Sequence, residues 1–242
     1  MATRLARHLA AALLATGLAF ATPAAAETLT FDFDHSFGEV PSDGPAPWLR
    51  AVFQDLGGGV VRLTMSAPGL STDTGGGAQQ PEFAHEWWFN LNPAYSADLL
   101  VATPQAGIVA ASIDRPGEPG IGSKLKPDGD GVFSFRFNFG PGALAFGQSS
   151  AYDLSVTGVP GLTARDFDHF STPAGGTTGP FRAAAHIQST GPLNEGSDFV
   201  APRAIPEPAS LALAATAMLG LAFARRRRAG MRAQAQQRGN KV

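Results

Sequence analysis

Cysteine is missing from this chain of 242 residues. Without cysteine the protein cannot form a disulfide bond, hold a metal ion through thiolates or use a thiol as a nucleophile. The folded chain is therefore stabilised without disulfide bonds or thiolate metal sites.

Positive charge is scarce in the central part of the chain. Residues 27–204 contain nine lysines and arginines against 19 aspartates and glutamates. An acidic segment is repelled by the phosphate backbone, so nucleic acid is not an expected partner. Its charge suits a protein that is soluble outside the cell or one that binds divalent cations.

The central part also lacks the hydrophobic period of amphipathic helices. It contains instead short alternating runs rich in aromatic and β-branched residues, separated by glycine, proline, aspartate and serine. The clearest run is Val132–Phe139, where four phenylalanines alternate with Ser134, Arg136 and Asn138. We expect the phenylalanines to face the core and the polar residues, Arg136 included, to face outward.

Similar runs predict eight to ten strands and an all-β fold. The triplet Gly57–Gly59 predicts a hairpin, after which Val61, Leu63 and Met65 should face the core. Many short strands with glycine-rich connections favour an antiparallel β-sandwich, jelly-roll-like in topology. The expected strands are Thr28–Asp34, Trp48–Gln54, Val60–Ser66, Phe83–Leu91, Ile108–Ile113, Val132–Phe139, Tyr152–Val156 and Phe181–Gln188.

The N-terminus has the three parts of a secretory signal. A basic start precedes an apolar stretch over 9–21, and the small residues Ala24 and Ala26 fit cleavage just before Glu27. We expect a signal helix over 1–26 that signal peptidase removes.

The C-terminal region combines three features in order, and together they predict a transmembrane helix. A helix over its apolar segment spans roughly 24 Å at about 1.5 Å per residue. That length crosses a bilayer that thins locally while the arginines reach the headgroups, and these arginines stay in the cytoplasm. The features are the motif Pro206, Glu207 and Pro208, the apolar segment Ala209–Ala224, and the arginines Arg225, Arg226, Arg227 and Arg228.

This order of features resembles the PEP-CTERM sorting signal. The resemblance implies recognition by an exosortase, a membrane-embedded protease of Gram-negative bacteria, and cleavage near the Pro-Glu-Pro motif. It also implies a transient anchor in the inner membrane and later release to the cell surface or to exopolysaccharide. The hairpin around Gly57–Gly59 and the segment Trp87–Pro93 are similar to an ectodomain type that recurs among PEP-CTERM proteins.

We therefore expect five parts in the chain. They are a signal peptide over 1–26, a β-sandwich ectodomain over 27–191, a linker over 192–204, the sorting signal with its transmembrane helix over 205–228, and a polar cytoplasmic tail over 229–242.

Two groups of carboxylates are candidate cation sites. Asp128 and Asp130 lie two residues apart in a glycine loop and could bind Ca²⁺, although a Pro-Asp-Gly turn is the simpler interpretation. Asp166 and Asp168, followed by His169, would share one face of a strand, either as metal ligands or as a solvated edge. No other cofactor is expected.

The dipeptide formed by His85 and Glu86 precedes two tryptophans. Carboxylates beside exposed aromatic rings occur in glycan-processing clefts, so Trp48, Trp87 and Trp88 are candidate sugar platforms. Burial of these rings in a core is the alternative, and their exposure decides between the two. The second histidine of a His-Glu-x-x-His zinc motif is missing, which excludes that motif.

The function that the sequence predicts is that of a secreted surface or matrix protein without catalytic activity, associated with exopolysaccharide or biofilm. Signal peptidase and the exosortase would process it. One alternative is a carbohydrate-binding module or secreted glycan hydrolase. Another is an ice-binding protein, because tails of this type are also labelled as an ice-binding C-terminus. A flat ice-binding face needs a regular ladder of threonines. The expected strands offer one pair of alternating threonines, Thr28 and Thr30.

Overall fold

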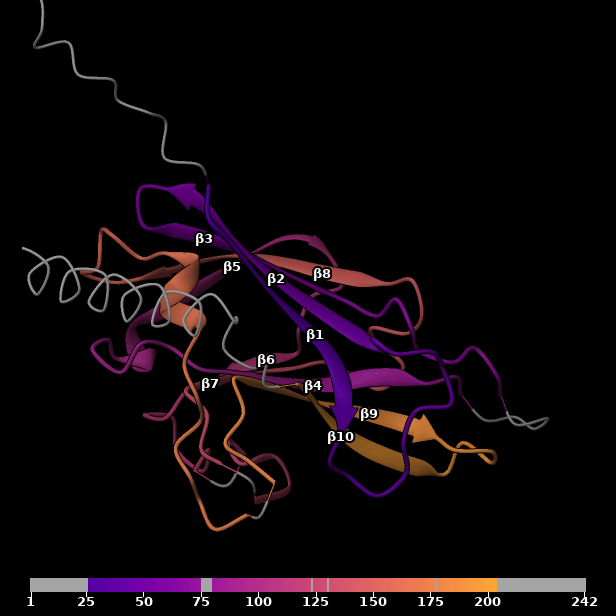
Figure 1. The fold of residues 1–242 in the computed structure, drawn as a ribbon. Helices are drawn as coiled ribbons and strands as arrows, with labels where there is room; N and C mark the ends of the chain where they lie inside the picture. Colours follow the sequence, from indigo (N-terminus) through magenta and orange to yellow (C-terminus); the bar gives the residue numbers. More distant parts are fainter. Residues whose placement is uncertain (1–25, 75–79, 123, 130, 177, 204–242) are drawn as a thin grey trace, which may run out of the picture. The chain divides into compact units, whose positions relative to one another are not determined.

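The structure is a computed structural model that describes residues 26–74, 80–122, 124–129, 131–176 and 178–203. These residues form ten strands and three short 3₁₀ helices, which confirms the all-β class (Figure 1). The elements are β1 (Thr28–Ser36), β2 (Leu49–Gly57), β3 (Val60–Ser66), β4 (Phe83–Phe89), η1 (Ala97–Leu99), β5 (Leu100–Gly107), β6 (Ser112–Asp114), η2 (Pro127–Gly129), β7 (Phe135–Asn138), β8 (Ser149–Val156), η3 (Ala164–Phe167), β9 (Ala183–Thr190) and β10 (Gly196–Pro202).

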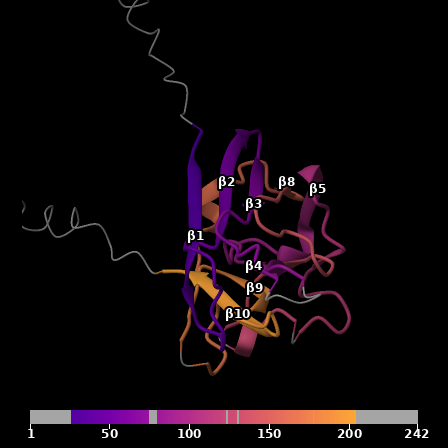
Figure 2. The same ribbon diagram turned by 90° about the vertical axis from the view of Figure 1, so that its right-hand side faces the viewer.

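All ten strands belong to one antiparallel sheet, and strand β1 allows that sheet to fold over on itself. The strand order is β5-β8-β3-β2-β1-β10-β9-β4-β7-β6. The first part of β1, Thr28–Phe33, pairs with β2, while its last part pairs with β10. The register of β1 against β10 shifts between Phe33 and His35, and a bulge of this kind bends a strand. Figures 1 and 2 show β1 running along the junction between the two halves of the sheet.

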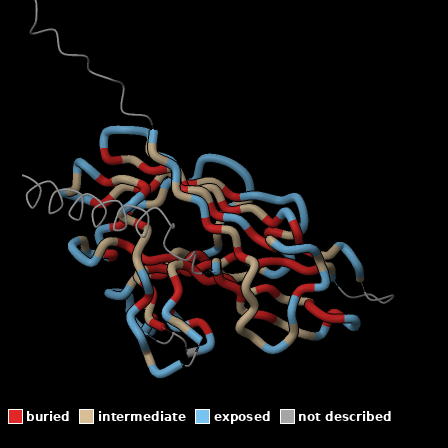
Figure 3. The backbone as a smooth tube through the Cα atoms, in the orientation of Figure 1, coloured by how far each residue is buried: buried red, intermediate tan, exposed pale blue. Residues whose placement is uncertain are grey.

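The two halves of the sheet pack face to face through aromatic rings. Phe53 of β2 lies against Phe89 of β4 with ring centres 5.3 Å apart, and Tyr152 of β8 lies 4.8 Å from Phe137 of β7. Buried segments follow the strands, whereas exposed segments follow the connecting loops (Figure 3). The core therefore has the two layers of the expected sandwich, but a single curled sheet provides both of them.

The hairpin between β2 and β3 agrees with the sequence. Gly57, Gly58 and Gly59 all have positive φ, a conformation that glycine adopts without a steric penalty. The alternation that follows is also confirmed, because the side chains of Val61, Leu63 and Met65 are fully buried.

The strand expected over 108–113 is only partly confirmed, and the strand before it was not expected. The structure has β6 at Ser112–Asp114 and β5 at Leu100–Gly107. Strand β5 lies at one end of the sheet and is mostly exposed. It contains Pro104, and proline is tolerated in an edge strand because it lacks a backbone N–H to donate.

The expected linker over 192–204 is wrong for most of its length. Gly196–Pro202 forms β10, which pairs with β1 on one side and with β9 on the other. Val200 and Ala201 of this strand are fully buried. The folded unit therefore continues to Arg203 rather than ending near residue 191.

Within the part of the chain that the structure describes, no helix is long and apolar enough to cross a membrane. Residues 1–25 of the expected signal peptide and the apolar segment Ala209–Ala224 lie outside the described residues. The two terminal helices therefore stay predictions.

Candidate functional site

A bulge in β4 brings two neighbouring polar side chains to the same face of the sheet. The register of β4 against β9 shifts between Ala84 and Glu86, so His85 is an extra residue on this strand. Ala84 and Trp87 both pack in the main core. Because one extra residue lies between these two inward positions, His85 and Glu86 both point to the outer face. Glu86 pairs there with His186 of β9.

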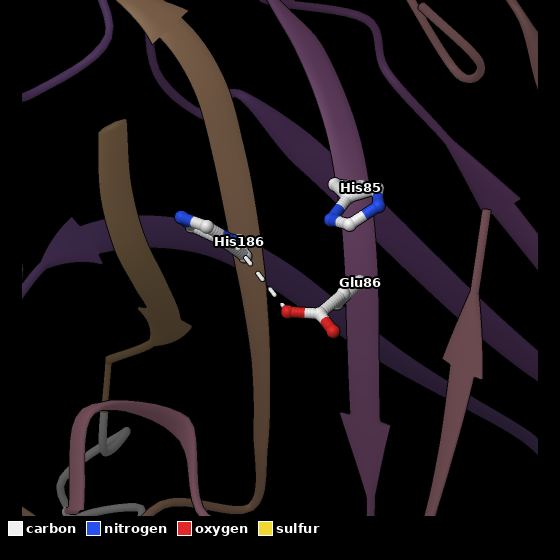
Figure 4. Close-up of side chains that lie close together, drawn as sticks. All are labelled: His85, Glu86 and His186. Carbon is white, nitrogen blue, oxygen red and sulfur yellow. Dashed lines mark ion pairs between the residues drawn. The ribbon is translucent and has the colours of Figure 1, made fainter. Parts of the chain in front are cut away.

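The side chains of His85, Glu86 and His186 form a compact cluster on this outer face (Figure 4). One potential ligand atom from each residue lies within 4.8 Å of the other two. The Nδ1 atom of His186 is 3.5 Å from Oε2 of Glu86. The side chains of His186 and Glu86 are 14% and 16% exposed, so the cluster is sheltered but open to small solutes.

A buried arginine holds the carboxylate of this cluster from the opposite side. Nη1 of Arg136 on β7 pairs with Oε1 of Glu86, and Nε of Arg136 donates a hydrogen bond of 2.8 Å to Oδ2 of Asp114 on β6. The side chains of Arg136 and Asp114 are only 7% and 6% exposed. Arg136 lies on the face opposite the phenylalanines of its strand, as expected, and two carboxylates from neighbouring strands cover it there.

Several ring nitrogens of the cluster are buried without a hydrogen bond. Within the described residues, Nδ1 of His85 and Nε2 of His186 have no hydrogen-bond partner. The imidazole of His186 stacks on Phe199 with ring centres 4.4 Å apart and planes inclined by 6°. A buried polar group without a partner costs about 1–3 kcal/mol, so an arrangement that leaves two such nitrogens needs an explanation.

The environment of the cluster sets the charge of its members. Burial lowers the pKa of His85, and the charges of His186 and Arg136 act in the same direction. Burial acts to raise the pKa of Glu86, but its contact with His186 and the charge of Arg136 outweigh this effect, so the pKa lies below its ordinary value. At neutral pH the cluster therefore combines a neutral imidazole with an ionised carboxylate, which is the protonation state that metal ligands require.

The three tryptophans are buried, so of the two alternatives for them the structure favours packing in the fold. The exposed fractions of Trp48, Trp87 and Trp88 are 9%, 0% and 2%. Nε1 of Trp48 donates to a loop carbonyl 2.9 Å away, and Nε1 of Trp88 donates to a carbonyl at 2.7 Å. Trp87 packs between the two halves of the sheet. Trp48 and Trp87 pack in the main core, whereas Trp88 packs in a second apolar cluster with Phe133 and Phe181, so none of the rings offers a face to a sugar.

The two expected carboxylate clusters differ in outcome: the first lies partly outside the described residues, and the second is taken up by local contacts. Asp128 is exposed on η2 with a positive φ of 44°, while Asp130 lies outside the described residues, so the Ca²⁺ prediction is not tested. Asp166 lies in η3 rather than on a strand, and its Oδ2 accepts a hydrogen bond from the backbone N–H of Thr163 at 2.9 Å. Asp168 pairs with Arg182 at 3.0 Å.

Comparison with known proteins concerns the end of the chain. Residues 204–228 match the family model of the PEP-CTERM protein-sorting motif. No curated protein and no solved structure matches the chain. The matched residues contain Pro206, Glu207, Pro208 and the four arginines from Arg225 to Arg228, all outside the described residues. The motif supports sorting by an exosortase to the outside of the cell, and by this motif the chain is a PEP-CTERM protein.

Proposed function

We propose that the protein is a non-catalytic component of the cell surface or exopolysaccharide matrix, which an exosortase cleaves within Pro206-Glu207-Pro208. The observation that carries the proposal is the match of residues 204–228 to the sorting motif. Signal peptidase would first release the N-terminus before Glu27, and the apolar segment would then hold the exported domain at the inner membrane.

The position of the last strand supports cleavage at this motif. Strand β10 ends at Pro202, and Pro206 follows four residues later. Cleavage at Pro206 or beyond therefore removes no strand of the sheet. Glu27 at the start of the mature chain pairs with Arg165, so removal of the signal after Ala26 also leaves the described contacts intact.

The remaining alternatives have less support. A glycan-binding cleft built on Trp48, Trp87 or Trp88 loses its basis, because these rings are buried. The exposed residues Thr28 and Thr30 pair across to Gln54 and Val52 of β2, so the threonine pair does not extend into a ladder on the next strand. Ice binding therefore lacks the repeated face that it requires.

The proposal can be tested by expressing the chain in a bacterium with an active exosortase and determining the mature C-terminus by mass spectrometry. We expect peptides that end within residues 205–208 in the extracellular fraction. The variant Glu207→Gln should accumulate in the membrane as the uncut form. Glu195→Gln is the matched control, because Glu195 is exposed and precedes the last strand.

Two results would overturn the proposal. Extracellular peptides that run intact from Pro208 through Ala224 would show that no cut is made at the motif. Equal processing of Glu207→Gln and Glu195→Gln would show that the protease does not recognise Glu207 of the motif. Loss of the processed protein from washed exopolysaccharide would limit the proposal to release into the medium and refute its matrix role.

A further inference from the structure

We propose that His85, Glu86 and His186 bind a divalent transition metal ion, with Zn²⁺ as the preferred ion, on the outer face of β4 and β9. Two imidazole nitrogens and a carboxylate oxygen are a donor set that zinc commonly uses. The site is independent of the sorting motif, because all three residues belong to the folded sheet.

The geometry of the cluster is close to that of a bound metal. Zinc bonds of about 2.0–2.1 Å at tetrahedral angles place neighbouring ligand atoms about 3.3 Å apart. Oε2 of Glu86 and Nδ1 of His186 are already 3.5 Å apart. Since all three ligand atoms lie within 4.8 Å of one another, His85 has to approach by at most about 1.5 Å, which a side-chain rotation provides.

The bulge in β4 is the feature that makes this donor set available. In a regular strand His85 and Glu86 would point to opposite faces, and only one of them could meet His186. The extra residue puts both on the outer face. Bulges often redirect a side chain next to a functional site.

The unsatisfied nitrogens supply an independent argument for a ligand. Nδ1 of His85 and Nε2 of His186 are buried and have no hydrogen-bond partner among the described residues. A metal ion that takes one nitrogen of a ring also polarises the opposite N–H toward water or a carbonyl. A metal held through Nδ1 of His85 would occupy a buried nitrogen that otherwise has no hydrogen-bond partner.

The surrounding charges favour a cation. Glu86 and Asp114 carry two negative charges against the single positive charge of Arg136, so the group has a net negative charge. Arg136 contacts Oε1 of Glu86, which leaves Oε2 directed at His186. Arg136 thus acts as a positioning residue that presents one carboxylate oxygen to the metal, as is usual for partners of metal ligands.

The consequence for the fold is a cross-strand link. A metal held by β4 and β9 would tie two neighbouring strands of a protein that has no cysteine for a disulfide. The partly exposed side chains of Glu86 and His186 leave room for water as a fourth ligand. We therefore expect the metal to raise the thermal stability of the chain.

The test uses the full chain, purified in detergent with a tag that contains no histidine and treated with EDTA. Isothermal titration calorimetry with ZnCl₂ should show one ion bound per chain. Scanning calorimetry should show a higher melting temperature with ZnCl₂ than in EDTA. Loss of a partner in the outer shell of a metal site typically weakens binding 10–100-fold, so His85→Gln and His186→Gln should each weaken it by at least about 100-fold. The control is the double variant His35→Gln/His169→Gln, which replaces the other two histidines of the mature chain and should bind as tightly as the wild type.

X-ray absorption at the zinc edge of the wild-type protein keeps the proposal testable if a variant fails to fold. We expect two imidazole ligands together with oxygen donors. The proposal is overturned if the wild type binds no zinc, if the spectrum contains fewer than two imidazoles, or if the His35/His169 variant loses binding while the His85 and His186 variants keep it. Each of these results is independent of whether the exosortase cuts the tail.

Discussion

Replacement of Arg136 by methionine should destabilise the folded domain strongly. Arg136 pairs with both Glu86 and Asp114, whose side chains are 16% and 6% exposed. Removing one partner of a buried ion pair leaves an uncompensated buried charge and costs about 3–5 kcal/mol. For a domain of this size, 1 kcal/mol corresponds to about 2–4 °C in melting temperature. We therefore expect the melting temperature to decrease by roughly 6–20 °C. Arg136, Glu86 and Asp114 are called the charge triad below.

The assay is thermal unfolding of residues 27–203 in EDTA, followed by circular dichroism. Arg50→Met is the matched control, because the pair that Arg50 makes with Asp32 is 46% and 44% exposed. Exposed pairs contribute about 0–1 kcal/mol, so this variant should melt within a few degrees of the wild type. In 1 M salt the deficit of Arg136→Met should persist, since buried charges are screened much less than exposed ones.

A compensated variant separates the charge argument from a packing effect. In Arg136→Met combined with Glu86→Gln and Asp114→Asn, no buried charge of the triad remains. Replacing a whole buried ion-pair network by neutral groups is often close to neutral for stability. We expect the triple variant to recover at least half of the lost stability. The reasoning about the charge triad is refuted if the triple variant is no more stable than Arg136→Met. It is also refuted if Arg136→Met and Arg50→Met have the same melting temperature.

Two further predictions concern a buried carboxyl group and a close backbone approach. Asp198 is fully buried, and burial raises the pKa of its carboxyl group. The folded state is therefore stabilised at low pH, where this carboxyl is protonated, and it loses that stability as the pH rises through the raised pKa. Asp198→Asn, which keeps the acceptor for Ser36, should therefore gain stability over the wild type between about pH 4 and neutral pH; melting temperatures measured from pH 3 to 8 check this, and a difference that does not change with pH contradicts it. Gly69→Ala should cost about 1–3 kcal/mol, because its Cβ would lie 2.1 Å from the carbonyl oxygen of Pro45. Gly140→Ala, where no atom lies within 4 Å of the new Cβ, should stay within about 0.5 kcal/mol in the same denaturant titration, and equal effects of the two would rule out steric overlap as the cause.

The strands that could be predicted from the sequence are those with clear alternation. In β3 the inward positions are all aliphatic or methionine, and the glycines before it mark the hairpin. In β7 the phenylalanines mark the buried face in the same way. These local patterns identify which face of a strand is buried, and they are reliable because burial of apolar side chains dominates the folding energy.

Two strands could not be recognised because their sequences do not alternate. Strand β5 is mostly exposed and contains Pro104, so it resembles a loop. Strand β10 contains Gly196, Asp198 and Pro202, which are rare in strands. Its place in the middle of the sheet depends on partners far away in the sequence, and no local pattern reports that pairing.

The candidate site was visible only in fragments. His85 and Glu86 stand out as adjacent polar residues, and His186 stands out as a polar residue on an expected strand. Their contact depends on the pairing of β4 with β9 and on the bulge at His85. Likewise, alternation placed Arg136 on the correct face but could not show that Glu86 and Asp114 cover it. Register and bulges arise from long-range pairing, which one sequence does not reveal.

The place of β10 between β1 and β9 determines when the sheet can be completed during export. During export the N-terminal strand β1 emerges first, but one of its two neighbours is the last strand to emerge. Until residue 202 is outside, β1 and β9 present unpaired edges that can recruit another chain. The sheet is therefore completed only a few residues before the sorting motif. Under the proposed cleavage, the domain would be released with both of those edges already paired.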